Sequence, residues 1–315
     1  MFSHLLYYLI FETFEPSYGT FVSIMPPQVV ASALTAVPRP SNDQTGQANT
    51  LGLSLFAPNS PIKIGDSIAP VLEAKSVYAI DLNTGSPLLV QDIFTRRPIA
   101  SIAKLITAMV TLDNHQLDEK VTVSKNAAST EGSAMQLIVG EEITVGNLLT
   151  GLLVNSGNDA AVALAEYDAG TESEFVKKMN SKGIDLGLKD TNFSNAKGFD
   201  EKENYSTAFD TMLFARAALQ YSFIKKTVRI KMGEVKSVSG KTVHKLESTN
   251  ELLENPYFKV IGLKTGLTPA AGESFVSLVI GPNNHEILTI MLDSPHRFIE
   301  TKILIDWILR NYKFP

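Results

Sequence analysis

The sequence predicts an α+β fold in which helices pack on an antiparallel β-sheet. Strand-like segments rich in β-branched and aromatic residues lie at residues 76–92 and again at 257–294. Between them, residues 100–220 carry apolar residues mainly at helical spacing. Because strands flank a helical middle, we expect one sheet built from both ends of the folded part.

The first expected elements are a hairpin and a buried helix. SVYAIDL and SPLLVQD are separated by Asn83-Thr84-Gly85, a combination typical of a β-turn between two strands. A nearly all-apolar helix is then expected from Ala100, in the stretch PIASIAKLITAMVTLD. Its burial makes the single lysine, Lys104, the first residue that needs a chemical explanation.

The middle of the chain, about residues 115–220, is expected to be a helical insertion. Residues 121–147 contain short strand-like and loop segments, and residues 145–168 indicate helices interrupted at 155–158. Two further amphipathic helices are predicted in ESEFVKKMNSKGIDLGL and TAFDTMLFARAAL. Strands are then expected in VRIKMGEVKSV and near 257–265, followed by the hairpin ESFVSLVIG/EILTIMLD and the closing helix FIETKILIDWILRNY.

The region before the folded part divides in two. Residues 1–36 are apolar overall but interrupted by Glu12, Glu15 and Pro16. No lysine or arginine stands before the apolar stretch, as it would in a typical signal peptide. With Ala31-Ser32-Ala33 as a small-x-small cleavage pattern, we interpret them as an irregular export signal or N-terminal anchor. A misplaced start codon or a disordered tail is the alternative. Residues 37–74, rich in Pro, Ser, Asn and Gly, are expected to be a linker, and residues 75–315 the folded domain.

Composition excludes several classes of function. The net charge of −5 and the pI of 5.6, without a basic stripe, argue against binding nucleic acid. The absence of cysteine excludes thiol catalysis, disulfides and cysteine-ligated metals. The histidines show no metal-ligand spacing, so we expect no metal and no cofactor.

Ser101 and Lys104 are the first candidates for catalysis. Residues three apart share a helix face, and burial lowers the pKa of a lysine, so that its neutral amine can accept a proton from serine. The pattern is weak alone, because Ser-x-x-Lys also occurs at Ser60/Lys63, Ser194/Lys197 and Ser222/Lys225, in the linker, a polar loop and a helix end. There we expect solvated lysines. The alternative for Lys104 is a side chain that reaches the surface.

Two later motifs complete the candidate site. Ser156-Gly157-Asn158 interrupts two apolar helical runs, which places a hydroxyl and an amide in one loop. Lys264-Thr265-Gly266 ends a predicted strand and offers an ammonium and a hydroxyl to a carboxylate, while the glycine permits close approach of a substrate backbone. Either motif alone could be an ordinary turn.

In this order the three motifs resemble those of the serine D-Ala-D-Ala carboxypeptidases, the low-molecular-mass penicillin-binding proteins. The similarity runs from about Ser76 to the C-terminus and includes PIASIAKLITAMVTL, GSAMQLIVGEEITVGNLLTGLLVNSGNDAAVALAE, DTNFSNAKGFD, YSTAFDTMLFARAAL, STNELL and RFIETKILIDW. It implies a β-lactamase/transpeptidase-like fold, with an antiparallel sheet flanked by helices and a mainly helical subdomain. Residues 75–315 would form this penicillin-binding peptidase domain.

The resemblance also implies a role for each residue. Ser101 would attack the penultimate D-Ala carbonyl, with Lys104 as general base. Ser156 would relay a proton to the leaving amine, and Lys264 would set the electrostatics of Ser156. Asn158 would hold both Lys104 and the substrate backbone. The N–H groups of Ser101 and of Leu267, which follows Gly266, would form the oxyanion hole, and Thr265 with Arg297 would bind the terminal carboxylate. For Arg297, the alternative is a helix-cap arginine at the surface.

The implied substrate is a peptidoglycan pentapeptide, and β-lactams would inhibit by acylating Ser101. The location would be extracytoplasmic, with membrane association through the N-terminus, because the chain stops soon after its closing helix. A D,D-endopeptidase uses the same residues and stays an alternative, as do a β-lactamase and a non-catalytic penicillin-binding module. The Glu-x-x-Leu-Asn motif of class A β-lactamases is missing, although Glu251-Leu-Leu-Glu-Asn is near in form. The chain also departs from the family's frequent Asn-Pro-x-Gly, with Asn195-Ala196-Lys197-Gly198.

Overall fold

The computed structural model describes residues 59–315. The predicted export signal or anchor at 1–36 and most of the predicted linker lie outside the described residues. Within residues 59–315, no helix is both long enough and apolar enough to cross a membrane.

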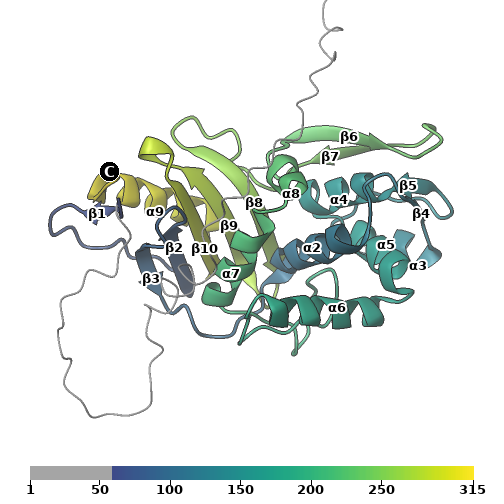
Figure 1. The fold of residues 1–315 in the computed structure, drawn as a ribbon, viewed down its shortest axis with the longest axis horizontal. Helices are drawn as coiled ribbons and strands as arrows, with labels where there is room; N and C mark the ends of the chain where they lie inside the picture. The colour runs from purple at the N-terminus through teal and green to yellow at the C-terminus, as the bar shows by residue number, and fades with distance from the viewer. Residues whose placement is uncertain (1–58) are drawn as a thin grey trace, which may run out of the picture.

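A five-stranded antiparallel sheet forms the centre of the molecule (Figure 1). Its strands, in spatial order, are β3 (Pro87–Gln91), β2 (Ser76–Asp81), β10 (Glu286–Ser294), β9 (Gly272–Ile280) and β8 (Lys259–Thr268). The central pair, β2 and β10, joins the two ends of the folded part, with Tyr78 opposite Ile290. The predicted sheet built from both ends is confirmed, and β8 is one of its two edges.

The two faces of the sheet bury different cores, because alternate residues of a strand point to opposite sides. On β2, Tyr78 and Ile80 join a core shared with the helical subdomain. Val77 and Ala79 join a second core, which is closed by α9 (Arg297–Asn311). Figure 1 shows α9 on the opposite side of the sheet from the group of helices.

The helical subdomain begins with η1 (Ala100–Ala103), a 3₁₀ turn that leads directly into α2 (Lys104–Asn114). It continues with β4 (Lys120–Thr122), α3 (Lys125–Ala128), β5 (Glu142–Thr144), α4 (Val145–Val154), α5 (Asn158–Ala169), α6 (Glu172–Asp185), α7 (Ala208–Ala218) and α8 (Ser222–Thr227). Side-chain oxygens of Ser124, Thr144, Thr171 and Thr207 cap the N-termini of α3, α4, α6 and α7. The predicted interruption at 155–158 is therefore the junction of α4 and α5.

The predicted strand in VRIKMGEVKSV is the first strand of a hairpin outside the main sheet. Its strands β6 (Met232–Lys236) and β7 (Val243–Glu247) pair only with each other and lie above α4 in Figure 1. The side-chain amide of Asn147 donates to the Lys236 carbonyl at 2.8 Å, and the Val238 N–H donates to the Glu142 carbonyl at 2.7 Å. The hairpin thus extends the helical subdomain rather than the sheet.

The end of the predicted linker packs on the folded domain, so the expected boundary at residue 75 lies too late. β1 (Ile62–Lys63) pairs with β11 (Tyr312–Lys313), and the Trp307 indole N–H donates to the Ile68 carbonyl at 2.9 Å. Leu72 is buried in the second core. Composition alone misses this order because the segment is held largely through its backbone groups and through the buried side chain of Leu72.

The connection between β9 and β10 is a short turn. A short 3₁₀ turn, η2 (Pro282–Asn284), joins β9 to β10 and confirms the predicted hairpin around PNNH. Residues 269–271 join the end of β8, where the Lys-Thr-Gly motif lies, to the start of β9. The motif is therefore fixed at the end of a well-paired edge strand.

Candidate active site

Ser101 and Lys104 lie at the start of the helix that is buried between sheet and subdomain. Ser101 is half-buried in η1, and Lys104, the first residue of α2, is completely buried. The Lys104 Nζ atom lies 2.7 Å from the Ser101 Oγ atom. The alternative of a lysine that reaches the surface is excluded, and the spacing of three residues brings the two groups into direct contact.

The amine of Lys104 has two further partners, both of which can only accept hydrogen bonds. It donates to Asn158 Oδ1 at the start of α5 and to the main-chain carbonyl of Lys197, each at 2.7 Å. The amide nitrogen of Asn158 is in turn fixed by the Glu131 carbonyl at 2.8 Å. The predicted partnership of Asn158 with Lys104 is present, whereas the Lys197 carbonyl was not foreseen.

The surroundings hold the pKa of Lys104 well below its usual range. The largest cause is burial, which penalises the ammonium form, and the positive charges of Lys264 and Lys197 act in the same direction. The carboxylate of Asp159 opposes them. A lysine in this setting is suited to accept a proton from a neighbouring hydroxyl.

Ser156 and Lys264 form a second serine–lysine pair, assembled from two elements. Ser156 sits in the α4–α5 junction in the left-handed backbone region, with φ of 58°, a conformation that is rare for non-glycine residues. The Lys264 Nζ atom on β8 donates to Ser156 Oγ at 2.9 Å and to the Thr265 carbonyl at 3.0 Å. Burial first, and then the charge of Arg297, lowers the pKa of Lys264 to about 7.

The carboxylate side of the site is built from β8 and its neighbours. The Thr265 hydroxyl lies 2.5 Å from the hydroxyl of Thr249, and Arg297 Nη1 donates to the Gly266 carbonyl at 2.8 Å. The Nε atom of Arg297 is buried without a hydrogen-bond partner in the described residues. Arg297 therefore lies against the Lys-Thr-Gly motif and is not the surface cap of the alternative interpretation. Thr249 was missed as an individual residue, although it belongs to the quoted stretch STNELL.

The packing of β8 gives Gly266 a role beside the expected approach of a substrate backbone, which stays a prediction. A Cβ atom at Gly266 would lie 2.8 Å from the Ile99 carbonyl oxygen and 3.0 Å from the Ala100 Cβ. The glycine therefore lets β8 approach the turn that carries Ser101. Leu267 follows on the same edge strand with its side chain 61% exposed, and its N–H in an oxyanion hole stays a prediction.

The other serine–lysine matches within the described residues are not equivalent to this site. Lys225 forms a surface ion pair with Glu286 at 2.8 Å, consistent with a solvated helix end. For Lys197 the expectation of a simply solvated side chain is wrong. It is 13% exposed, forms an ion pair with Glu172 at 2.7 Å and lies over the ring of Phe199.

The comparisons with known proteins agree with the geometry. A sequence profile of the D-alanyl-D-alanine carboxypeptidases, peptidase family S11, matches residues 65–295. This chain belongs to that family. The resemblance inferred from the three motifs is thereby confirmed, and the family match extends into the segment that had been expected to be linker.

Three members illustrate the similarity. The D-alanyl-D-alanine carboxypeptidase DacF of Bacillus subtilis is 39% identical over 204 residues, which are 63% of this chain and 52% of the relative. DacD of Salmonella typhimurium is 31% identical over 83% of this chain and 71% of its own length. The crystal structure of the Streptomyces K15 DD-transpeptidase is 31% identical with a TM-score of 0.72, covering 78% of this chain and all of that one. The chain spans about half the length of the Bacillus relative, and the solved structure confirms the predicted β-lactamase/transpeptidase-like fold.

Replacing Arg297 with glutamine should lower acylation by peptides with a free C-terminal carboxylate roughly 10- to 100-fold, because a charge-assisted partner is lost. The measurement is the acylation rate with a peptide ending in D-Ala-D-Ala and with its C-terminal amide. The amide should react equally with both proteins. Equal losses for the two peptides would contradict a carboxylate-binding role.

Proposed function

We propose that the protein is a serine D,D-carboxypeptidase that removes the terminal D-Ala from peptidoglycan stem peptides. The observation that carries this proposal is the meeting of three distant motifs, in which Lys104 contacts both Ser101 and Asn158, and Lys264 contacts Ser156. Both lysines are buried with lowered pKa values, as proton transfer near neutral pH requires. Membership in the D-alanyl-D-alanine carboxypeptidase family points to the same reaction.

In the acylation step, neutral Lys104 takes the proton of the Ser101 hydroxyl while Oγ attacks the carbonyl carbon of the penultimate D-Ala. The negative charge of the tetrahedral intermediate would be stabilised by the N–H groups of Ser101 and Leu267, a contribution typically worth ~10²–10³ in rate per donor. When the C–N bond breaks, the D-Ala amine leaves with a proton from Ser156. Because Lys264 already donates to the Ser156 oxygen, the Ser156 O–H remains available for this transfer.

Ser156 regains its proton from the Lys104 ammonium, so Lys104 is neutral again before deacylation. In the deacylation step, water attacks the ester carbonyl while Lys104 takes a proton from that water and returns it to Ser101 Oγ as the ester C–O bond breaks. The products are the shortened stem peptide and free Ser101. A β-lactam carries the same carboxylate and an amide that Ser101 can open, so we expect a covalent adduct. Since peptidoglycan lies outside the cytoplasmic membrane, the site of action would be extracytoplasmic, and the predicted association through residues 1–36 belongs to this proposal.

The test is covalent labelling with a fluorescent penicillin, read by gel and by the mass of the intact protein. Wild type should gain one penicillin, and Ser101→Ala should gain none because the proposal places the ester on the Ser101 oxygen. Ser222→Ala, in the matched motif whose Lys225 is paired with Glu286 at the surface, should label normally. An unlabelled wild type, or a labelled Ser101→Ala, would refute the acyl-enzyme.

The fate of peptide substrates separates the related reactions. Release of D-Ala from a pentapeptide supports the carboxypeptidase, and cleavage restricted to cross-linked dimers supports the endopeptidase. The solved relative is called a DD-transpeptidase, so an added amine acceptor tests whether the acyl group passes to an amine instead of water. Rapid turnover of a chromogenic cephalosporin would favour the β-lactamase.

A further inference from the structure

The loop of residues 194–199, here called the Asn195 loop, supplies a partner of Lys104 through the carbonyl of Lys197. A neutral lysine amine has two N–H bonds and one lone pair. The oxygens of Asn158 and of the Lys197 carbonyl can only accept, so together they occupy both N–H bonds. The lone pair is then left for the hydroxyl of Ser101, and its direction depends on where the Asn195 loop holds that carbonyl.

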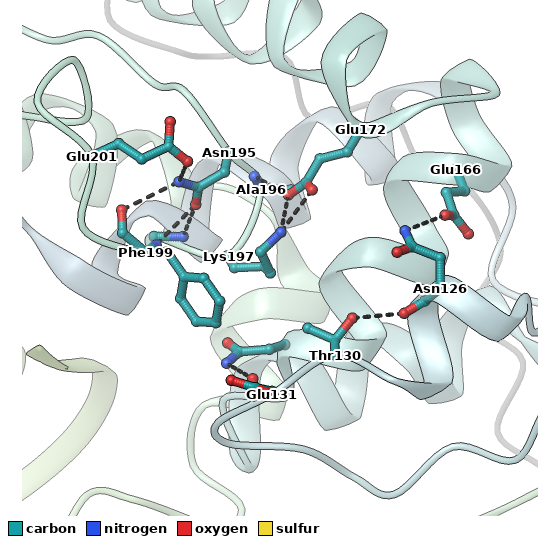
Figure 2. Close-up of polar contacts among 12 residues, drawn as sticks. Asn126, Thr130, Glu131, Glu166, Glu172, Asn195, Ala196, Lys197, Phe199 and Glu201 are labelled. Carbon is teal, nitrogen blue, oxygen red and sulfur yellow. Dashed lines mark hydrogen bonds and ion pairs between the residues drawn. The ribbon is translucent and has the colours of Figure 1, made fainter.

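One carboxylate holds the loop at two adjacent positions. Glu172, the first residue of α6, accepts the Ala196 N–H at 2.9 Å through Oε1. Both of its oxygens accept from the Lys197 ammonium, at 2.8 and 2.7 Å, and Figure 2 shows this side chain extended from the loop towards Glu172. The side chains of Glu172 and Lys197 are 24% and 13% exposed, so solvent only partly screens the pair.

Apart from Glu172, the Lys197 side chain contacts only the ring of Phe199 among the described residues, and that contact lies within the loop itself. The Asn195 side-chain oxygen accepts from the N–H groups of Gly198 and Phe199, which closes the turn on itself. The Thr107 hydroxyl on α2 donates to the Ala196 carbonyl at 2.8 Å. Neither contact reaches the side chain of Lys197.

The residue at position 196 makes the main-chain contact possible. Position 196 is alanine, which, unlike proline, has a main-chain N–H to donate. Alanine supplies this donor, and Glu172 is placed to accept it. Glu172 thus holds the loop by its main chain as well as by the side chain of Lys197.

We propose that Glu172 is a positioning residue for the Ser101–Lys104 pair, acting through the main chain of Ala196 and the side chain of Lys197. The inference rests on the proposed function, since it concerns the same acylation step. Glu172 does not touch the reacting atoms. It fixes the Lys197 carbonyl and neutralises the Lys197 charge beside the general base.

The ion pair between Glu172 and Lys197 determines in which direction each substitution shifts the pKa of Lys104. The charged groups that act on Lys104 are Lys264 from β8, Lys197 from the Asn195 loop and Asp159 from α5. Removing the Glu172 charge leaves the Lys197 ammonium uncompensated, which lowers the pKa of Lys104 further. Removing the Lys197 ammonium leaves the carboxylate of Glu172 alone, which raises the pKa of Lys104.

The experiment measures the rate of acylation by benzylpenicillin against pH, by mass spectrometry of the intact protein. Glu172→Gln should lower the plateau rate roughly 10- to 100-fold through misplacement of the base, and its acid limb should move to lower pH. Lys197→Met should move the acid limb to higher pH. Lys197→Arg, which can still reach both carboxylate oxygens, should restore the wild-type limb.

Glu174→Gln is the matched control, because it makes the same change on the same helix in an exposed pair with Lys177. It should leave rate and pH profile unchanged. Thermal unfolding of each variant is measured alongside. If Glu172→Gln does not fold, the pH profiles of Lys197→Met and Lys197→Arg test the proposal instead. The proposal would be overturned if the acid limbs of Glu172→Gln and Lys197→Met shifted in the same direction. It would also be overturned if neither limb shifted in variants that benzylpenicillin still acylates. A wild type that is not acylated at all would instead refute the proposed function.

Discussion

Replacing Lys104 with methionine should reduce the acylation rate of Ser101 by roughly 10³- to 10⁴-fold at neutral pH, the upper range for loss of a general base. Methionine has a similar length and fills the same buried space, but it cannot accept the Ser101 proton. The measurement is the rate of penicillin adduct formation by rapid quench and mass spectrometry. The residual rate should no longer follow the ionisation of Lys104.

Lys225→Met is the matched control for this prediction. Lys225 has the same Ser-x-x-Lys spacing from Ser222, but it lies at the surface in an ion pair with Glu286. Its replacement should leave acylation unchanged. If folded Lys104→Met is acylated at a rate within about tenfold of wild type, the decrease is too small for the loss of a general base. Another group would then act as the base, and Lys264 would be the next residue to test.

The contact between Ser101 and Lys104 could be predicted because its geometry is local. Two residues three apart on one helix share a face whatever the rest of the chain does, so Ser101 and Lys104 could be paired in advance. The antiparallel sheet could also be predicted, since strand-like hairpins at both ends of the folded part flank a helical middle. Asn158 and Lys264 entered through motifs that matched a family, and not through any calculation of where they would lie.

The parts that escaped prediction depend on contacts between distant segments. The carbonyl of Lys197 contacts Lys104 across 93 positions of sequence, and any residue type would supply the same oxygen. No side-chain pattern marks such a contact. Glu172 reads as an ordinary acidic residue in the first turn of a helix, where it suits the helix dipole, and only the fold brings it to Ala196. The contact of Gly266 with Ile99, from the other end of the domain, was likewise not predicted.

The buried lysines also predict how stability depends on pH. The pKa of Lys264 is about 7 in the folded protein and 10.5 in the unfolded chain. Between these values the unfolded state binds the additional proton, so the unfolding free energy rises with pH at ~1.4 kcal/mol per unit, about 5 kcal/mol in total. Lys104, whose pKa is also lowered by burial, contributes with the same sign.

Urea unfolding between pH 7 and 9.5, followed by the fluorescence of the single tryptophan, Trp307, measures this slope. Lys264→Met should reduce proton uptake on unfolding by about one, and the slope by ~1.4 kcal/mol per pH unit. The window stops below pH 10 because burial raises the pKa of Tyr78 to about 12, so the unfolded tyrosine loses its proton first and stability falls above that pH. Parallel curves for wild type and Lys264→Met would mean that Lys264 keeps its proton when folded. The hydrogen bond to Ser156 would then come from a full ammonium, which would make Lys264 a fixed positive charge beside the leaving group rather than a group that titrates during the reaction.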